Sequence, residues 1–219
     1  MECMSIDELL LGVDIGGTIV KIGLLNHQGD FLNKWEIPTN KDDNGAGIAE
    51  DIWESVISTL SNEQMDRVIG IGVGAPGFIN QETGIVEEAV NIGWKNYHLS
   101  DELQRLSNLP VFVENDANLA ALAENWKGSG QSAENLLFIT LGTGVGGGVI
   151  VSGELLSGTN GTAGEIGHIL VEPNGYTCNC GREGCLETIA SATGIVRLAT
   201  DSLSEHPDSR LAVRYNEHG

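Results

Sequence analysis

The sequence predicts a mixed α/β fold, and three of its patterns support that class. Short apolar runs end in clusters of glycine, which is typical of strands followed by tight turns. Apolar residues recur every four positions from Ile48 to Leu60, the spacing of an amphipathic helix. At residues 111–126 a short strand pattern leads directly into a strong helix pattern. The 219 residues suffice for one large domain or for two lobes.

The first half of the chain reads as strands separated by turns, with two helices. The run Leu9–Val13 ends at a glycine turn, Ile19–Leu25 resumes with strand-like residues, and a second turn leads to Phe31–Ile37. An antiparallel meander is therefore expected. Further strands are expected at residues 68–75 and 84–90, and helices at residues 48–60 and at 99–106 with Ser100 as its cap.

The second half alternates strands and helices in the same way. The expected strands are residues 111–113, 136–141 and 149–151, and the expected helices are residues 117–126 and 187–203. The residues after 203 read as a polar tail.

Residues 14–18, Asp-Ile-Gly-Gly-Thr, form the first candidate ligand loop. Gly16 and Gly17 let a backbone approach a phosphate closely, and Thr18 adds a hydroxyl group. Asp14, at the end of the first strand, could hold Mg²⁺ directly or through water. An ordinary Gly-Gly hairpin turn is the alternative.

Asp116 follows a short strand and precedes a helix. An aspartate at such a junction either caps the helix or meets a substrate, and capping is the commoner role. The neighbouring Asn115 and the glycine loops shift the balance toward a substrate, but both roles stay open.

A second glycine cluster occupies residues 142–148. Gly142, Gly144 and Gly147 satisfy the dinucleotide-binding pattern G-x-G-x-x-G, and Glu165 falls near the place of its ribose-binding acid. That pattern requires a helix to open at the glycines, whereas the following residues read as a strand and a turn. No Walker-type phosphate loop is present either. We therefore expect two glycine-rich hairpins, one in each half of the chain, to hold a polyphosphate.

Three of the four cysteines fall within eight residues, at positions 178, 180 and 185, and His168 lies ten residues before the first of them. These four side chains can complete a tetrahedral Cys₃His zinc site with no further ligand. The Cys-x-Cys spacing is tighter than usual. The alternatives are reduced, buried cysteines or a disulfide with one spare thiol.

Two acidic residues flank these ligands, Glu165 before His168 and Glu187 after Cys185. A metal that fixes the loop would also fix both carboxylates, and a ligand rich in hydroxyl groups could use them. Ordinary surface acids are the alternative.

The composition limits the classes of partner. Acidic residues outnumber Lys and Arg by 31 to 11, which gives a formal net charge of −20. Such a surface repels phosphate backbones and anionic membranes, so binding to nucleic acid or membrane is not expected. Residues 1–11 carry no basic residue and no apolar run reaches transmembrane length. A cytoplasmic location is therefore expected, where thiols stay reduced.

Six motifs occur in order and together resemble the ROK family of sugar kinases and repressors, in particular its bacterial ATP-dependent glucokinases. The motifs are Asp14–Thr18 with Lys21, Gly74–Gly77, Glu114–Asn118, Leu141–Gly146, Glu165–His168 and Cys178–Glu187. Each motif alone is weak, but six in sequence are specific.

The resemblance implies a two-lobed, actin-like and ribonuclease-H-like fold with its active site in the cleft between the lobes. Residues 1–114 would form the N-terminal lobe with the first phosphate hairpin. Residues 115–219 would form a partial C-terminal lobe with the catalytic aspartate, the second phosphate loop and the zinc loop. Asp116 would be the general base, taking the proton from the C6 hydroxyl of glucose as that oxygen attacks the γ-phosphorus of ATP.

The resemblance also assigns ligands to the other candidates. The sugar would be held by Gly77, Asn91, Asn115, Asp116, Glu165, His168 and Glu187. The nucleotide would be held by Asp14, Gly16, Gly17, Thr18, Lys21, Gly142, Thr143 and Gly144. Structural zinc would be held by His168, Cys178, Cys180 and Cys185, with the second ring nitrogen of the histidine left for the sugar. Catalysis would use Mg²⁺ on the nucleotide, and the protein would be a homodimer.

Family members with other activities supply the alternatives. Kinases for N-acetylmannosamine, N-acetylglucosamine, fructose and allose share these loops, and a few contacts decide among the sugars. A non-catalytic sugar sensor is possible in principle, but Asp116 is present. A repressor would add a DNA-binding helix pair and a basic face, and this chain is strongly acidic.

The chain stops at Gly219, whereas members of the family continue further. The resemblance therefore predicts an incomplete second lobe, with poor ATP affinity and marginal stability for residues 1–219 alone. Robust turnover by this polypeptide would contradict that prediction. Ile19 stands where Asn or Thr often follows the Gly-Gly-Thr sequence, and little effect is expected because Thr18 and the glycine amides remain.

Overall fold

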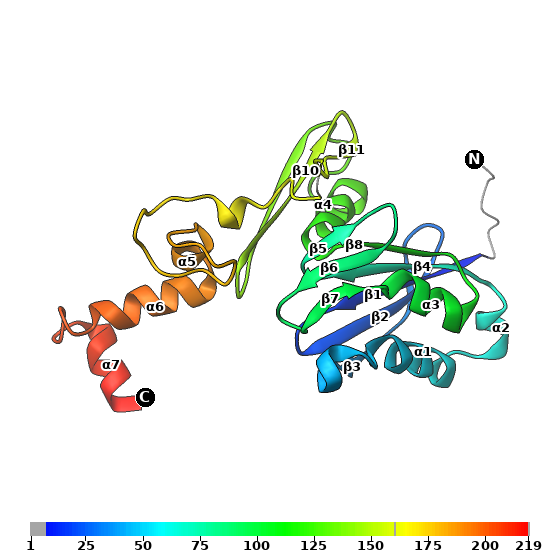
Figure 1. The fold of residues 1–219 in the computed structure, drawn as a ribbon, viewed down its shortest axis with the longest axis horizontal. Coiled ribbons are helices and arrows are strands. Elements are labelled where there is room, and N and C mark those ends of the chain that lie inside the picture. Colours follow the sequence, from blue (N-terminus) through cyan, green and yellow to red (C-terminus); the bar gives the residue numbers. More distant parts are fainter. Residues whose placement is uncertain (1–7, 160, 219) are drawn as a thin grey trace. The chain divides into compact units, whose positions relative to one another are not determined.

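The computed structural model describes residues 8–159 and 161–218 (Figure 1). Its contacts divide the chain into two compact units. The first unit contains the residues up to 119 together with 158–162, and the second contains 120–157 and the residues from 163 onward. The division falls inside one helix, a few residues after the boundary expected at 114.

A five-stranded sheet organises the first unit, with the strand order β3-β2-β1-β4-β8. The strands are β1 (Leu9–Ile15), β2 (Ile19–Asn26), β3 (Phe31–Pro38), β4 (Val68–Ala75) and β8 (Val111–Asn115). The first three pair antiparallel, as the expected meander requires, and β4 lies parallel to both β1 and β8. The parallel strands bring their carboxyl ends to the same edge of the sheet, where loops commonly bind ligands.

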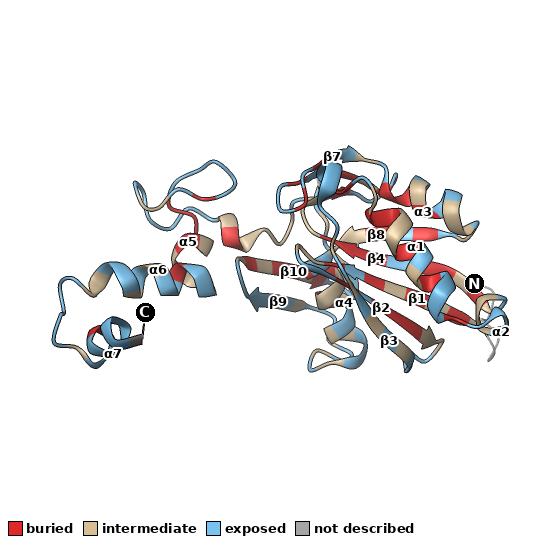
Figure 2. Ribbon diagram, turned by 90° about the horizontal axis from the view of Figure 1, so that it is seen from below, coloured by how far each residue is buried: buried red, intermediate tan, exposed pale blue. Residues whose placement is uncertain are grey.

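The core of this unit lies between the sheet and its helices. Alternate residues of β1 are buried because successive side chains of a strand point to opposite faces. Burial of each such aliphatic side chain contributes about 1.5–3 kcal/mol. The helices are α1 (Ile48–Thr59), α2 (Asn62–Met65) and α3 (Leu99–Ser107), with a 3₁₀ turn at Asp42–Gly45. Figure 2 shows the buried residues concentrated in the strands and along α1 and α3.

A small second sheet joins β5 (Phe78–Asn80), β6 (Ile85–Ala89) and β7 (Trp94–Tyr97) in that order. Only β6 was expected from the sequence, because β5 and β7 are too short to show a pattern. The predicted cap of α3 is wrong. Ser100 is buried within the first turn of that helix, where its hydroxyl donates a 3.2 Å hydrogen bond to the carbonyl oxygen of Val111 instead of accepting one from the helix end.

The second unit contains a three-stranded sheet of order β11-β10-β9 and several short helices. Its elements are β9 (Leu136–Leu141), β10 (Val145–Val151), β11 (Glu154–Leu155), a 3₁₀ turn at Ile166–His168, α5 (Glu187–Ala190), α6 (Ala192–Ser202) and α7 (Arg210–His218). Helix α4 (Asp116–Lys127) runs from the first unit into the second.

Strand β10 begins four residues before the expected start at 149, so part of the glycine cluster is strand. The reason is that β10 pairs antiparallel with β9 along its glycines. A Cβ atom on Gly147 would lie 2.6 Å from the carbonyl oxygen of Gly164, so only glycine admits this neighbour. The absence of a helix after the glycines confirms that the cluster is not a dinucleotide-binding turn.

The single helix expected at 187–203 is also wrong, because Ser191 interrupts it. The backbone of Ser191 is extended, and its hydroxyl accepts a 3.0 Å hydrogen bond from the backbone N–H of Gly194, which caps α6. The expected polar tail contains α7. Within the described residues, no helix is both long and apolar enough to cross a bilayer.

Candidate active site

The predicted site residues fall into two sets, one in each unit. The first set is Asp14, Gly16, Gly17, Thr18, Lys21, Gly77, Asn91, Asn115 and Asp116. The second set is Gly142, Thr143, Gly144, Glu165, His168, Cys178, Cys180, Cys185 and Glu187. Each set is built by side chains and turns of its own unit.

The first glycine hairpin joins β1 to β2, with Gly16 at its start. The N–H of Gly16 donates a 3.0 Å hydrogen bond to the carbonyl oxygen of Ile19, and its own carbonyl accepts a 2.7 Å bond from the hydroxyl of Thr39. A Cβ on Gly16 would lie 2.7 Å from the Ile19 oxygen, so the turn itself requires this glycine. At Gly17 the nearest atoms to a Cβ would be 3.8 Å away. An ordinary hairpin therefore accounts for Gly16 but not for Gly17.

Asp14 and Lys21 face each other across β1 and β2, with 3.5 Å between Lys21 Nζ and Asp14 Oδ2. Both side chains are more than half exposed. The carboxylate is an oxygen ligand of the kind that Mg²⁺ prefers, and Mg²⁺ commonly binds through one or two carboxylates plus substrate phosphates. The donor chemistry at Asp14 thus fits a nucleotide-bound magnesium ion.

Asn91 and one unexpected lysine lie beside the same hairpin. The Cβ of Asn91 and the Nζ of Lys41 would each be 3.8 Å from a Cβ on Gly17. Lys41 thus places a cation near Gly17. No sequence motif surrounds Lys41, so only the folded chain reveals this neighbour.

The hydrogen bonds at the strand-to-helix junction show which residue caps α4. Asn115 Oδ1 accepts hydrogen bonds from the backbone N–H of Ala117 at 2.9 Å and of Asn118 at 3.2 Å, the pattern of an N-cap. Asp116 Oδ1 shares only the Ala117 N–H, at 2.8 Å. The capping role therefore belongs to Asn115, and Asp116 is not needed for it.

The pKa of the Asp116 carboxyl is raised above its ordinary value. The main cause is desolvation, because the surrounding protein displaces water from the carboxyl group. Part of the residue is still exposed to solvent. The negative charge of Asp14 raises the pKa further, and the hydrogen bond from the Ala117 N–H acts in the opposite direction. A carboxylate with a raised pKa is a stronger base than an ordinary surface acid.

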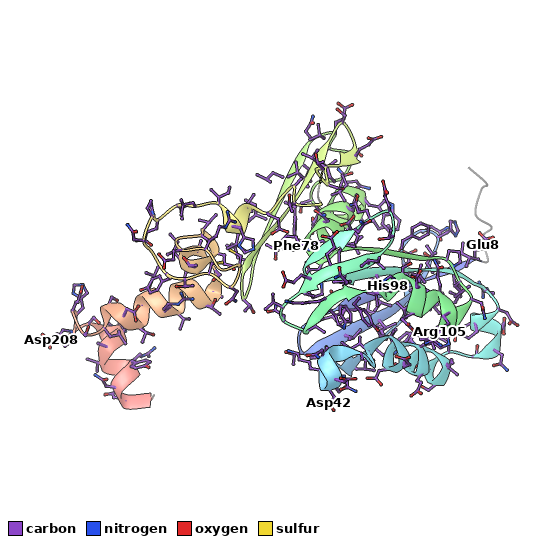
Figure 3. The ribbon with its side chains drawn as sticks, viewed as in Figure 1. Glu8, Asp42, Phe78, His98, Arg105 and Asp208 are labelled. Carbon is purple, nitrogen blue, oxygen red and sulfur yellow. The ribbon has the colours of Figure 1, made fainter. Side chains whose placement is uncertain are left out.

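Gly77 approaches this junction from the loop before β5. Asn115 Nδ2 donates a 3.1 Å hydrogen bond to the Gly77 carbonyl oxygen. The φ angle of Gly77 is 91°, and a Cβ would lie 2.0 Å from the carbonyl oxygen of Glu88. Only glycine can therefore bring this loop to Asn115. The strand β5 that follows carries Phe78, which is labelled in Figure 3.

The second glycine hairpin joins β9 to β10 through Gly142, Thr143 and Gly144. The start of α6 holds it in place, because the Ala192 N–H donates to the Gly142 oxygen at 2.9 Å and the Thr193 hydroxyl to the Thr143 oxygen at 2.7 Å. A Cβ on Gly142 would meet no atom within 4 Å. As at Gly17, neither packing nor a left-handed backbone demands this glycine.

Glu187 links this hairpin to the cysteine loop. Its Oε2 accepts a 3.2 Å hydrogen bond from the Val145 N–H, and a Cβ on Gly144 would lie 2.3 Å from the same oxygen. Its Oε1 accepts from the thiol of Cys178 at 3.2 Å. A Cβ at position 144 would therefore displace the Glu187 carboxylate from the Val145 N–H.

The Cys₃His cluster has the dimensions of a zinc site. The four ligand atoms of His168, Cys178, Cys180 and Cys185 all lie within 4.8 Å of one another. The Sγ atoms of Cys180 and Cys185 are 3.7 Å apart, and Cys178 Sγ is 3.5 Å from His168 Nδ1. Zn–S bonds of about 2.3 Å in a tetrahedron place two sulfur atoms about 3.8 Å apart. The three cysteines are free thiols, so the disulfide alternative is wrong.

The thiols differ in their ease of ionisation. Burial raises the pKa of Cys178 to about 12, and its hydrogen bond to Glu187 adds to this effect. At Cys180 burial also acts to raise the pKa, but hydrogen bonds from Arg182 and from the other two thiols lower it to about 6. One thiolate thus forms readily, and a bound cation would ionise the others.

His168 presents its two ring nitrogens to different partners. Nδ1 faces Cys178, while Nε2 lies 3.8 Å from Oε2 of Glu165. This arrangement suits a histidine that binds metal with one nitrogen and a second ligand with the other. The guanidinium of Arg182 donates a 3.0 Å hydrogen bond to the His168 carbonyl oxygen, a contact that the sequence did not suggest.

The sequence profile of the ROK family matches residues 10–218 of this chain. The chain belongs to the ROK family. The ROK match covers both units, and the mixed α/β fold expected from the sequence is confirmed as the actin-like fold of this family's kinases.

Individual ROK proteins match the chain over most of its length. A glucokinase from Halalkalibacterium halodurans is 54% identical over 216 residues, which are 97% of this chain and 66% of that protein. A glucokinase from Thermotoga maritima is 41% identical over 91% of this chain and 62% of that protein. The chain therefore spans about two thirds of these relatives or slightly less.

A solved structure shows the same ROK fold with ligands. The ROK glucokinase from Streptomyces griseus, in complex with glucose and AMPPNP, superposes with a TM-score of 0.75 at 37% identity. The match covers 91% of this chain and 62% of that structure.

Proposed function

We propose that the protein transfers the γ-phosphoryl group of ATP to the 6-hydroxyl of glucose. The observation that carries this proposal is the 54% identity to a glucokinase across 97% of the chain. The glucose and AMPPNP complex of a second relative supports both substrates. The geometry of the Asp116 junction and of the two open glycine hairpins fits that chemistry.

Asp116 is the proposed general base. The hydrogen bond from the Ala117 N–H orients its carboxylate, and the raised pKa makes it a better acceptor for the proton of the sugar hydroxyl. The proton moves to Asp116 as the hydroxyl oxygen attacks the γ-phosphorus and the bond to the β,γ-bridging oxygen breaks, which releases ADP. Such a base typically contributes a factor of about 10²–10⁴ to the rate.

The phosphates of ATP are proposed to lie against the backbone of the two glycine hairpins. A Cβ would make only ordinary van der Waals contacts at Gly17 and would meet no atom within 4 Å at Gly142, so packing closes neither hairpin, and Lys21 supplies a cation. Mg²⁺, when bound through Asp14 and the phosphates, supplies neutralisation of the charge on the transferring group. Phosphoryl transfer depends mainly on such positioning and neutralisation.

The sugar hydroxyls are proposed to bind the polar groups of both sets. These groups are Gly77, Asn91, Asn115, Asp116, Glu165, His168 and Glu187. The proposed zinc ion is structural, since its four ligands would leave no open position for a substrate. It would hold His168, and with it the loop that carries Cys178, next to Glu187. The homodimer and the cytoplasmic location stay predictions from the resemblance and the composition.

A coupled assay of ADP release by the complete protein tests the proposal. We expect glucose to give the highest kcat/KM among glucose, N-acetylmannosamine, N-acetylglucosamine, fructose and allose. We expect Asp116→Asn to lower kcat by at least about 100-fold, because the general base is lost. Wild-type turnover by that variant would show that Asp116 is not the base. A higher kcat/KM for another sugar would overturn the glucose assignment alone.

A further inference from the structure

Glu114 lies directly before the Asn115–Asp116 pair, and its carboxylate gathers three neutral N–H donors. Oε1 accepts hydrogen bonds from the backbone N–H of Asn115 at 2.8 Å and from Nδ2 of Asn118 at 3.0 Å. Oε2 accepts from Nε2 of Gln81. Neither the sugar contacts nor the phosphate contacts proposed above use this residue.

The buried side chain of Asn118 depends on the Glu114 carboxylate for its hydrogen bond. Its side chain is buried, with only 3% of the residue exposed, in the first turn of α4. Its Nδ2 donates to Glu114, while its Oδ1 has no hydrogen-bond partner among the described residues. Its backbone N–H donates to Asn115 Oδ1. Glu114 and Asn115 thus hold the same helical residue from two sides, and a buried amide without such partners would be costly.

Gln81 extends the same cluster to the neighbouring sheet. It directly follows β5, whereas Gly77 directly precedes that strand. Gln81 binds Glu114, and Gly77 binds the side chain of Asn115. Both ends of β5 are therefore tied to consecutive residues of the junction.

The simplest alternative is that Glu114 only complements the dipole of α4. An exposed acid at a helix N-terminus stabilises the helix only modestly and needs no specific partners. Glu114 is instead partly buried and accepts hydrogen bonds from a strand, a helix and a turn. Opposite it in β4 stands Gly74, where a Cβ would lie 3.3 Å from Leu119 and 3.8 Å from the Cα of Asp116. The first turn of α4 thus packs closely over this part of the sheet.

We propose that Glu114 is a positioning residue for phosphoryl transfer. Its carboxylate fixes the turn that carries Asn115 and Asp116, and through Gln81 it fixes the Gly77 loop against that turn. This inference rests on the proposed role of Asp116 as the general base. The structural reason is that one carboxylate joins the strand, the helix and the loop that carry three candidate residues.

Four variants of the complete protein test this role: Glu114→Ala, Glu114→Gln, Glu63→Ala and Asp116→Asn. We expect Glu114→Ala to lower kcat per folded molecule by about 10-fold to 100-fold, because misplacement of a catalytic group by about 1 Å has effects of this size. The KM for ATP should stay within about twofold of wild type, since the glycine hairpins are not touched. Folded protein is quantified by circular dichroism and gel filtration.

Glu114→Gln separates positioning from general stability. The oxygen of the new amide can still accept from Asn115 and Asn118, and its NH₂ group can donate to Gln81 after that side chain rotates its amide. We expect this variant to recover kcat to within about threefold of wild type. Glu63 is an exposed acid in the first turn of α2, so Glu63→Ala removes an equal charge elsewhere and should leave kcat unchanged.

The possible outcomes are distinct. If Glu114→Ala has wild-type kcat per folded molecule, or loses activity only in proportion to its unfolded fraction, Glu114 is not a positioning residue. If Glu114→Gln is as impaired as Glu114→Ala, the charge rather than the hydrogen-bond geometry matters and the proposal is wrong. Wild-type activity of Asp116→Asn would instead refute the proposed base, whatever Glu114 does.

Discussion

At the scale of single residues, the glycines of the first hairpin divide into two kinds. Gly16 is required by its own turn, whereas a Cβ on Gly17 would make only ordinary van der Waals contacts. We expect Gly16→Ala to lower the free energy of unfolding by about 1–3 kcal/mol, as overpacking does. We expect Gly17→Ala to keep the wild-type Tm but to raise the KM for ATP several-fold, because the new methyl group occupies space proposed for a phosphate.

Thermal unfolding and steady-state kinetics of both variants check this prediction. Gly142→Ala is a matched second case in the other hairpin, because a Cβ there would meet no atom within 4 Å. Unchanged ATP kinetics in both Gly17→Ala and Gly142→Ala would mean that these hairpins do not contact the nucleotide.

Asp116 should be unfavourable for stability while it is required for activity. Its pKa is raised in the folded state, so folding disfavours the ionised form. The contribution to stability is therefore highest below the unfolded pKa and is lost as the pH rises through the folded pKa. Asp116→Asn removes the charge but keeps an oxygen for the Ala117 N–H. We expect its Tm to exceed that of wild type at pH 7, and the difference to vanish below about pH 4.

Calorimetry of the two proteins between pH 3.5 and 7 measures this difference. A lower Tm for the variant at pH 7 would show that the ionised carboxylate stabilises the fold. Desolvation by the surrounding protein would then not be what controls the pKa of Asp116.

At the scale of elements, the start of α4 depends on the side chain of Asn115. We expect Asn115→Ala to lower the free energy of unfolding by about 1 kcal/mol, because the Asn118 N–H loses its side-chain acceptor and the Ala117 N–H keeps only Asp116 Oδ1. Asn115→Asp keeps that acceptor and loses only the donor to Gly77. It should therefore be the more stable variant, while both raise the KM for the sugar. Denaturant unfolding with sugar titration checks the order, and an unaffected Asn115→Ala would contradict the capping role.

The sequence correctly predicted elements whose apolar pattern is clear. The strands β4 and β9 have the predicted bounds because apolar runs lead to turns at both ends. The sequence failed to predict the start of β10, because three consecutive glycines resemble a loop and only their pairing with β9 shows them to be strand. The sequence also failed to predict the helix break at Ser191. A serine within a helical pattern can be recognised as a cap only once its hydrogen bond to Gly194 is known.

In the candidate site as well, some features could be predicted from the sequence and others could not. The Cys₃His cluster could be predicted because its ligands are close in sequence and chemically specific. The cap role of Asn115 was hidden, since its neighbour Asp116 is an equally good capping residue. The bond between Gln81 and Glu114 joins residues 33 positions apart, and no local pattern predicts such a contact.

At the scale of the whole molecule, the two units are stabilised in different ways. The described residues that form the hydrophobic core cluster all lie between Leu9 and Val113, in the first unit. Among the residues of the second unit that the structure describes, few apolar side chains are buried: Ala121, Val145, Ile150, Cys178, Cys185 and Ala212. Strand β9 leaves Leu137, Ile139 and Leu141 more than half exposed. The second unit, taken by itself, therefore has little hydrophobic stabilisation, and a metal site would contribute much of its folding energy.

This difference predicts a stepwise response to loss of zinc. The purified protein should contain about one zinc ion per chain. A chelator, or the substitution Cys185→Ser, should remove the zinc and unfold the second unit while the first unit stays folded on its own core. Limited proteolysis should then leave a fragment that ends within or soon after α4, near residue 119 where the units divide.

Cys3→Ser is the matched control, because this cysteine lies far from the cluster in sequence and should leave the zinc content unchanged. Metal analysis below half an equivalent of zinc in wild type would contradict the site itself. A chelated protein that unfolds in one cooperative transition at the wild-type Tm would contradict the dependence of the second unit on zinc. The structural basis is that Cys178 and Cys185 are themselves among the few buried side chains described in that unit, so the proposed zinc ligands are also part of its core.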